Sequence, residues 1–366
     1  MKSIYLTRRI VAVSLTAAMT MAAPAHAHDV YADDHAPIGI MADHAHKMGE
    51  VMFSARYMHM AMRGNQIGAD NATPEEIVTT VPNRFFGTPM QPPTLRIVPT
   101  EMRTDMVMLG AMYAPSDAVT LMVMGSYSEK EMDPVTFQGG MGTNRLGEFT
   151  TNPKGLGDIK VAALFPLLGH PDAKSDARDE LTLKVGISAP TGSTTKRAQI
   201  LAPMGGTPTV RTPYMMQIGS GSWDFEPALT YKMRHGKLGL GMQGSAKISL
   251  ERNDQDYRLG NVYEATAWTS YRPAQWVSLS ARAKFRAMGR IGGIDPAIMG
   301  PVQTANPDFQ GGERIDLIAG ANFVATHGAL AGHRLGLEIG KPVYQDLNGP
   351  QMKGDWVLTL GWQKAL

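Results

Sequence analysis

The sequence predicts an all-β protein, a transmembrane up-and-down antiparallel β-barrel of about 12 strands, of the outer-membrane type. Three observations favour this fold. Segments of about ten residues alternate apolar with polar or small side chains, as barrel strands do. Their connections alternate between short and long. Beyond residue 27, no stretch approaches the ~18 continuous apolar residues that a membrane helix needs.

The N-terminus resembles an export signal. Lys2, Arg8 and Arg9 flank the apolar run 10–25, and Ala25-His26-Ala27 fits the small-x-small cleavage pattern. We therefore expect a removed signal peptide over 1–27, a His/Asp-rich disordered leader over 28–47, and a barrel over 48–366.

The period-two pattern defines the strands. Twelve candidates follow one another along the chain: 49–63, 102–113, 118–132, 156–166, 179–190, 223–232, 237–250, 259–271, 276–288, 312–325, 333–342 and 354–365. The connections 114–117, 234–237, 272–275 and 326–332 are tight, whereas 64–101, 133–155, 191–222 and 289–311 are long. Short periplasmic turns and long external loops are typical of outer-membrane barrels, so both termini should be periplasmic.

Parity assigns the faces of each strand. In 118–132 the odd positions include Leu121 and Val123, and the even positions include Thr120, Met124 and Lys130. Only the odd face suits lipid, because an unpaired lysine is costly there. In the closing strand the outward face carries Trp356 and Trp362, as an aromatic girdle requires.

The same parity predicts what lines the lumen. Of the 26 methionines in the chain, those of the first three strands point inward. Three cations face inward from strand 276–288. The predicted solute path is Met52, Arg56, Met58, Met60, Met62, Met102, Met106, Met108, Met112, Met122, Met124, Arg282, Lys284 and Arg286. The three cations could steer anions, or pair with carboxylates across the lumen and hold its shape.

Composition excludes several functions. With no cysteine, the chain has no disulfide, iron–sulfur cluster or thiol catalysis. The formal charge of +2 includes the three cations of the export signal, so nothing suggests a nucleic-acid partner. The serines of GISAPTGS and GSGSWD lack the strand–turn–helix setting of a nucleophile elbow. We predict that the protein is not an enzyme.

Several blocks carry a resemblance to a known family. KMGEVMFSARYMHMAMRGN (47–65), MYAPSDAVTLMVMGSY (112–127), GLGDIKVAALF (155–165), KVGISAPTGS (184–193) and MQIGSGSWDFEPALTY (216–231) resemble the outer-membrane proteins named for a MetA pathway of phenol degradation. That resemblance implies a β-barrel and transport of hydrophobic or aromatic compounds. Relatives with a Met-rich first strand resemble proteins found in heavy-metal resistance settings.

The leader offers candidate metal ligands. His28, His35, His44 and His46 lie among four aspartates, and imidazole with carboxylate suits Cu(II), Ni(II) or Zn(II). A flexible polar leader without metal explains the same composition.

The lumen methionines leave three interpretations open. Flexible, polarisable thioethers suit aromatic solutes; they are also soft ligands for Cu(I) or Ag(I); or they simply pack a narrow lumen. We predict a monomeric channel, without cofactor, that passes a small hydrophobic or phenol-like solute. Outer-membrane lipid and the barrel-assembly machinery are its other expected partners. The alternative is a protein that handles copper or silver ions through the methionines and the leader.

Overall fold

The fold is described from a computed structural model, which places residues 31–169 and 177–366. The predicted signal peptide and His28 lie outside the described residues. Within the described part of the chain, no helix is long and apolar enough to cross a membrane.

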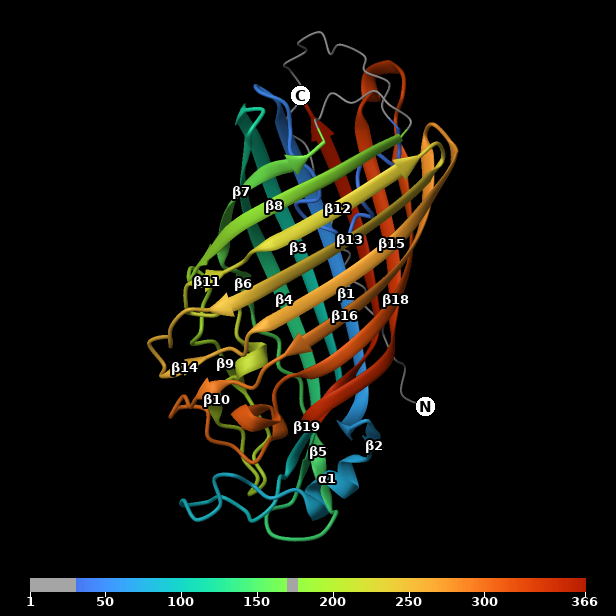
Figure 1. Ribbon diagram of the computed structural model, residues 1–366. Coiled ribbons are helices and arrows are strands. Elements are labelled where there is room, and N and C mark those ends of the chain that lie inside the picture. Colours follow the sequence, from blue (N-terminus) through green and yellow to red (C-terminus); the bar gives the residue numbers. More distant parts are fainter. Residues whose placement is uncertain (1–30, 170–176) are drawn as a thin grey trace.

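An antiparallel sheet closes into a barrel (Figure 1). Among the described residues eleven strands form its wall: β1 (Val51–Gly68), β3 (Ile97–Ser116), β4 (Val119–Phe137), β7 (Ile159–Leu168), β8 (Ala177–Ala189), β12 (Ala228–His235), β13 (Leu238–Ser249), β15 (Val262–Ala274), β16 (Val277–Met288), β18 (Gly312–Val324) and β19 (His333–Ala365). Pairing of β13 with β15 and of β19 with β1 joins the ends of the sheet. The fold class is confirmed.

The last strand doubles back on itself. Residues 334–347 of β19 pair with β18, and residues 347–365 pair with β1, both antiparallel. The halves lie side by side, since Trp362 Nε1 donates to His333 Nδ1 at 3.0 Å and Gln345 Nε2 donates to the Gly354 carbonyl at 3.1 Å. Because β19 crosses the wall twice, the eleven strands make twelve crossings of the wall. Each predicted strand therefore has a counterpart.

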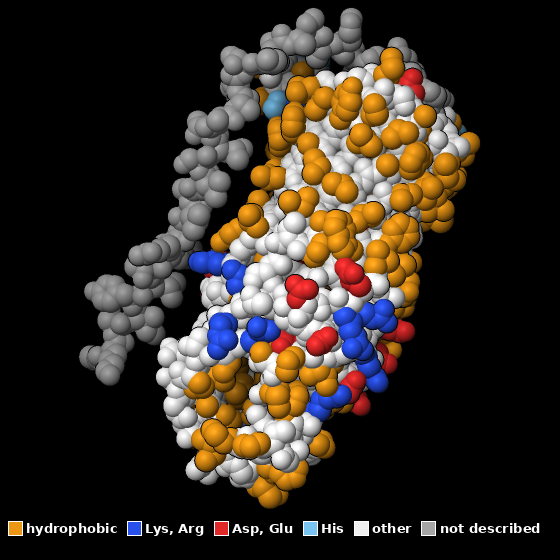
Figure 2. Space-filling view, turned by 90° about the vertical axis from the view of Figure 1, so that its left-hand side faces the viewer, with side chains coloured by type: hydrophobic (Ala, Val, Ile, Leu, Met, Phe, Trp, Pro, Cys, Tyr) orange, Lys and Arg blue, Asp and Glu red, His pale blue; other side chains and the backbone are white. Residues whose placement is uncertain are grey.

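Burial follows the predicted parity. Leu121, Val123 and Tyr127 of β4 are exposed on the outer face, whereas Thr120 and Met124 are buried inside. Hydrophobic side chains cover the barrel on its upper part in Figure 2, and charged side chains form a belt below them. Exposed ion pairs lie at the loop ends of the strands, such as Arg63–Glu101 at 3.0 Å. The apolar band therefore ends where the strands leave the bilayer.

The long connections form a compact cap at the end of the barrel opposite the C-terminus (Figure 1). The cap holds α1 (Pro74–Thr80) and the 3-10 helices η1 (Tyr214–Met216), η2 (Gln303–Ala305) and η3 (Pro307–Phe309); η4 (Gly328–Leu330) lies in a tight turn between β18 and β19. Short strands complete the loops: β2 (Asp70–Ala72), β5 (Arg145–Glu148), β6 (Lys154–Leu156), β9 (Arg197–Gln199), β10 (Thr209–Arg211), β11 (Asp224–Phe225), β14 (Tyr257–Arg258) and β17 (Gly292–Gly293).

Two apolar clusters hold the cap together. One packs Ile77 and Val78 of α1 against the ends of β3 and β4, and the other joins Phe85, Tyr214 and Tyr257 from three loops. Each buried side chain of this size stabilises the packed state by about 1.5–3 kcal/mol. The cap is therefore an ordered, packed structure at this end of the lumen.

Candidate functional site

The N-terminal segment lies inside the barrel. Residues 31–47, here called the plug, lie in the half of the lumen near the short turns. Ala36, Ile38, Ile40 and Ala42 are buried there, and the chain then enters β1. The sequence predicts a disordered leader over 28–47, and the described part of it differs: its small and apolar side chains are enclosed by the wall, which offers partners for its polar groups.

Guanidinium groups anchor the start of the plug. Asp34 contacts Arg234 Nη1 at 2.6 Å and Arg334 Nη2 at 3.4 Å, and Asp33 lies 3.3 Å from Arg272 Nη1. The ring of Tyr31 stacks beneath Arg272, with 3.8 Å from the guanidinium carbon to the ring centroid. These arginines come from three separate strands, so the anchor ties the plug to a wide arc of the wall.

The middle of the plug fits against glycines of the last strand. Ile38 fills the space over Gly336 and Gly361, where a Cβ at either position would overlap its side chain. Gly39 N donates to Glu338 Oε2 at 2.8 Å, and that carboxylate also pairs with Arg282. Because Gly336 and Gly361 have no side chains, β19 leaves room for the plug to pack against it.

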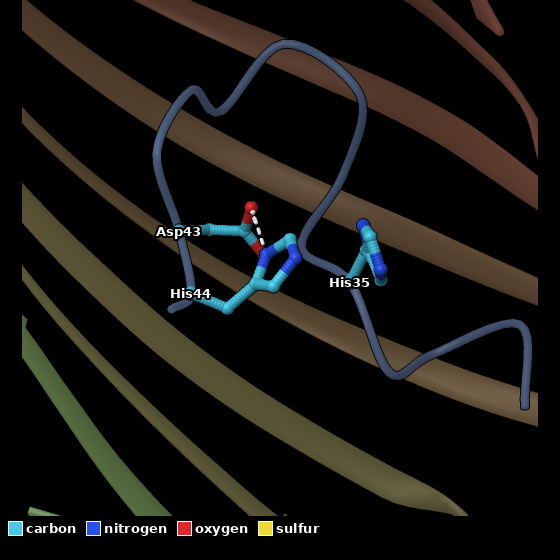
Figure 3. Close-up of side chains that lie close together, drawn as sticks. All are labelled: His35, Asp43 and His44. Carbon is cyan, nitrogen blue, oxygen red and sulfur yellow. Dashed lines mark hydrogen bonds and ion pairs between the residues drawn. The ribbon is translucent and has the colours of Figure 1, made fainter. Parts of the chain in front are cut away.

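Three imidazoles lie together at the far end of the plug. The ring centroids of His35 and His44 are 4.0 Å apart, and those of His44 and His46 are 4.7 Å apart. Figure 3 shows the His44 ring between Asp43 and His35. Asp43 Oδ1 accepts from His44 Nδ1 at 2.9 Å, and Glu50 lies 3.2 Å from His46 Nδ1.

Burial sets the charge of this group. Burial, together with nearby Arg334, holds the pKa of His35 well below its usual value. Burial also lowers the pKa of His44, although Asp43 opposes the shift. Burial disfavours the Asp43 carboxylate, but His44 and Lys232 outweigh it and keep the pKa of Asp43 well below its usual value. At neutral pH the uncharged imidazoles of His35 and His44 therefore lie beside the carboxylate of Asp43, which suits a metal ion.

Strand register gathers the methionines into two groups. Met62 lies opposite Met102, and Met102 opposite Met132. Together with Met216 from the cap and Met352 from β19 they form the mouth Met layer. This layer lies between the cap and the lumen.

The second group faces the plug. Met52 lies opposite Met112, which lies opposite Met122. With Met124 they form the plug-side Met wall, and they border a small cavity of about 20 Å³ that Asp43 and His44 also line.

A larger cavity occupies the middle of the barrel. Its volume is about 120 Å³, and it is lined by Gly39 and Ile40 of the plug together with Met58, Glu264 and Lys284 of the wall. The mouth Met layer bounds the lumen on the cap side, and the plug bounds it on the other.

The inward cations are paired. Arg282 binds Glu338 at 2.8 Å, Lys284 lies 3.5 Å from Asp316, and Arg286 lies 3.6 Å from Glu264. Of the two interpretations of these cations, the geometry favours a shape-holding role.

The remaining predicted path residues also face inward. Arg56 is buried and reaches the Ile40 carbonyl at 3.4 Å, and Met60, Met106 and Met108 are half-buried. Sequence reasoning missed Met132, Met216 and Met352. Parity could have found Met132, because even positions of its strand face inward. Met352 shares the even numbering of the outward Trp356, and a β-bulge between Gly354 and Trp356 turns it inward. No local pattern marks the loop residue Met216.

Comparisons with known proteins agree with this architecture. Residues 106–285 match the family described as "Putative MetA-pathway of phenol degradation". The family resemblance is confirmed. No protein of the curated set matches the chain.

Solved structures add evidence on the fold. An outer membrane channel from Pseudomonas putida F1 aligns with a TM-score of 0.56 at 14% identity, covering 89% of this chain and 99% of the channel. A FadL homologue of Pseudomonas aeruginosa aligns at 9% identity with a TM-score of 0.41, covering 86% of this chain and 90% of its own. The toluene transporter TodX of P. putida aligns at 8% identity with a TM-score of 0.40, covering 88% and 91%. At 14% identity, the alignment with the P. putida F1 channel shows similarity of fold and nothing further.

Proposed function

We propose that the protein is a monomeric outer-membrane channel that passes a small hydrophobic or phenol-like solute through a methionine-lined lumen. The family match and the barrel fold support the channel, and the exposed apolar band supports its contact with membrane lipid. The observation that carries the choice of solute is the mouth Met layer.

The mouth Met layer forms an apolar constriction. Met102, Met132 and Met216 are each less than a tenth exposed. Thioether side chains have three rotatable bonds and are polarisable, so they can part around a flat aromatic ring and close behind it. An apolar constriction also excludes ions, because it loses its water readily and an ion would have to give up its hydration shell to enter.

The cavity below the layer can hold such a solute. Its volume is about 120 Å³, so only a small solute fits without movement of the surrounding side chains. Met58, Ile40 and Val357 supply apolar lining, and the paired charges leave hydroxyl-bearing solutes with hydrogen-bond partners. A phenol satisfies both kinds of surface.

The plug stands between this cavity and the periplasmic end. A solute that reaches the cavity can leave the barrel only after the plug shifts. The plug is held mainly by polar contacts rather than by a large apolar core, so a shift within the barrel is compatible with its structure.

Neighbouring residues of the cap provide the test. Met216 is buried at 1% exposure, whereas Met215 beside it is 36% exposed. In Gram-negative cells that express the protein, Met216→Asp should lower protein-dependent uptake of labelled phenol by about tenfold, since an unpaired carboxylate in the constriction costs over 1.4 kcal/mol. Met216→Ala widens the constriction and should raise uptake, and Met215→Asp should leave it unchanged.

Opposite signs for the two Met216 variants separate a transport effect from misfolding. Heat-modifiable migration of the barrel checks folding of every variant. Unchanged uptake in a folded Met216→Asp protein would contradict the proposed path.

A further inference from the structure

The imidazole cluster of the plug has no part in the passage of a neutral solute. His35, Asp43 and His44 each offer one ligand atom, and these three atoms lie within 4.8 Å of one another. Two ligands on opposite sides of a metal with bonds near 2.1 Å are about 4.2 Å apart. Small side-chain rotations would therefore bring the two imidazoles around one ion, with the carboxylate beside them.

Unpartnered ring nitrogens point to a ligand. His35 Nδ1, His44 Nε2 and His46 Nε2 are buried and have no hydrogen-bond partner among the described residues. A buried polar atom without a partner costs about 1–3 kcal/mol. Three of them in adjacent rings make a cost that a bound cation would remove.

Carboxylates orient two of these rings from behind. Asp43 holds Nδ1 of His44, and Glu50 holds Nδ1 of His46. Histidines that bind metal almost always place their second ring nitrogen on such a partner, because it fixes the ring and makes the free nitrogen more basic. The cluster thus has the second layer of contacts that metal sites have.

We propose that the plug binds a divalent late first-row transition-metal ion, with His35 and His44 as imidazole ligands and Asp43 as the carboxylate that orients His44. This inference stands apart from the proposed solute path. Imidazole ligands favour Cu(II), Ni(II) and Zn(II), and among these Cu(II) binds most tightly in the general order of stability.

The surroundings favour copper further. His44 and Asp43 border the same cavity as Met41, Met52 and Met112. Thioethers are soft ligands that select Cu(I). An ion at the imidazole site would therefore face sulfur ligands suited to reduced copper, which neither nickel nor zinc requires.

Binding should tighten the plug itself. Both proposed imidazole ligands come from residues 35–44 of one segment, so the ion would close a loop within the plug instead of clamping the plug to the wall. A metal-loaded plug should consequently be more resistant to local opening, and the stabilisation follows the ratio of free ion to dissociation constant.

Titration of the purified full-length barrel in detergent with CuSO₄ tests the site. Calorimetry should give one tight site per chain, and the Cu(II) paramagnetic resonance spectrum should show coupling to two imidazole nitrogens. His35→Ala/His44→Ala should weaken this site by at least about 100-fold, and Asp43→Asn by about 10- to 100-fold.

The matched control replaces imidazoles elsewhere. His235 and His327 lie on exposed parts of the chain near the tight turns, so His235→Ala/His327→Ala should bind copper as the wild type does. A wild-type affinity no tighter than that of His35→Ala/His44→Ala, or a spectrum without nitrogen coupling, would overturn the proposal. Heat-modifiable migration confirms that each variant retains the barrel.

Discussion

The charged anchor of the plug offers a direct test of how the lumen is closed. Asp33 and Asp34 meet Arg234, Arg272 and Arg334 within 2.6–3.7 Å, and the side chain of Asp33 is only 1% exposed. In Asp33→Asn/Asp34→Asn the arginines stay in place without a counter-charge. The docked plug is thereby destabilised, while the strands of the wall are unchanged.

The magnitude follows from burial. Breaking a buried ion pair by removing one partner costs about 3–5 kcal/mol. The anchor lies near the end of a wet lumen, so we take the lower bound of about 3 kcal/mol for the double change, which corresponds to a roughly 150-fold shift of the docking equilibrium.

Conductance in planar bilayers measures this shift. The open probability of the double variant should be about 100-fold higher than that of the wild type, because undocking of the plug opens the lumen and the docking free energy falls by about 3 kcal/mol. The control is Glu251→Gln/Asp254→Asn, which removes the same charge from exposed positions of the cap. An open probability in Asp33→Asn/Asp34→Asn that equals that of the control would refute the view that these carboxylates hold the lumen closed.

Two further predictions concern stability. Arg282→Met should lower the free energy of unfolding in urea by about 3–5 kcal/mol because Glu338 is left charged and buried, whereas Arg282→Met/Glu338→Met should be nearly neutral; equal losses in both would show that the pair itself stabilises the barrel. Thr73→Ala removes the capping box of α1 and should lower the stability of that helix by about 1 kcal/mol, seen as faster amide exchange in α1 alone. Faster exchange throughout the barrel would contradict a local role for the capping box.

The strands could be predicted because each carries its own signal. Alternation in β4 places Leu121 outside and Thr120 inside whatever the partner strand is, since period two is a property of the strand itself. The same rule found most of the methionine groups, because inward parity on neighbouring strands becomes contact once the register is set. The helix α1 also had a readable signal, the sequence Thr73-Pro74-Glu75-Glu76, which has the Thr-x-x-Glu pattern of a capping box.

The plug could not be predicted in this way. Its alternation is confined to Ala36–Ala42, and the aspartates and histidines on either side have the composition of a solvated leader. What orders them is the wall: Asp34 and Arg234 are 200 positions apart in the chain, and Gly39 and Glu338 are 299 apart. Such contacts depend on the closed barrel, and no local pattern of charges records them.

The order of surfaces along the lumen bears on how the two proposals can coexist. From the cap inward a solute would meet the mouth Met layer, then the cavity with paired charges, then the plug with its imidazoles. A neutral aromatic molecule loses its hydration at the first surface at little free-energy cost. The plug, with Ile38 packed on the glycines of β19, is the last barrier on its path. A copper ion crosses an apolar constriction poorly, so it would reach the imidazoles from the turn end, where Asp33 and Asp34 offset the arginines. The methionines would thus serve solutes that enter from the cap, and the histidines ions that enter from the opposite end.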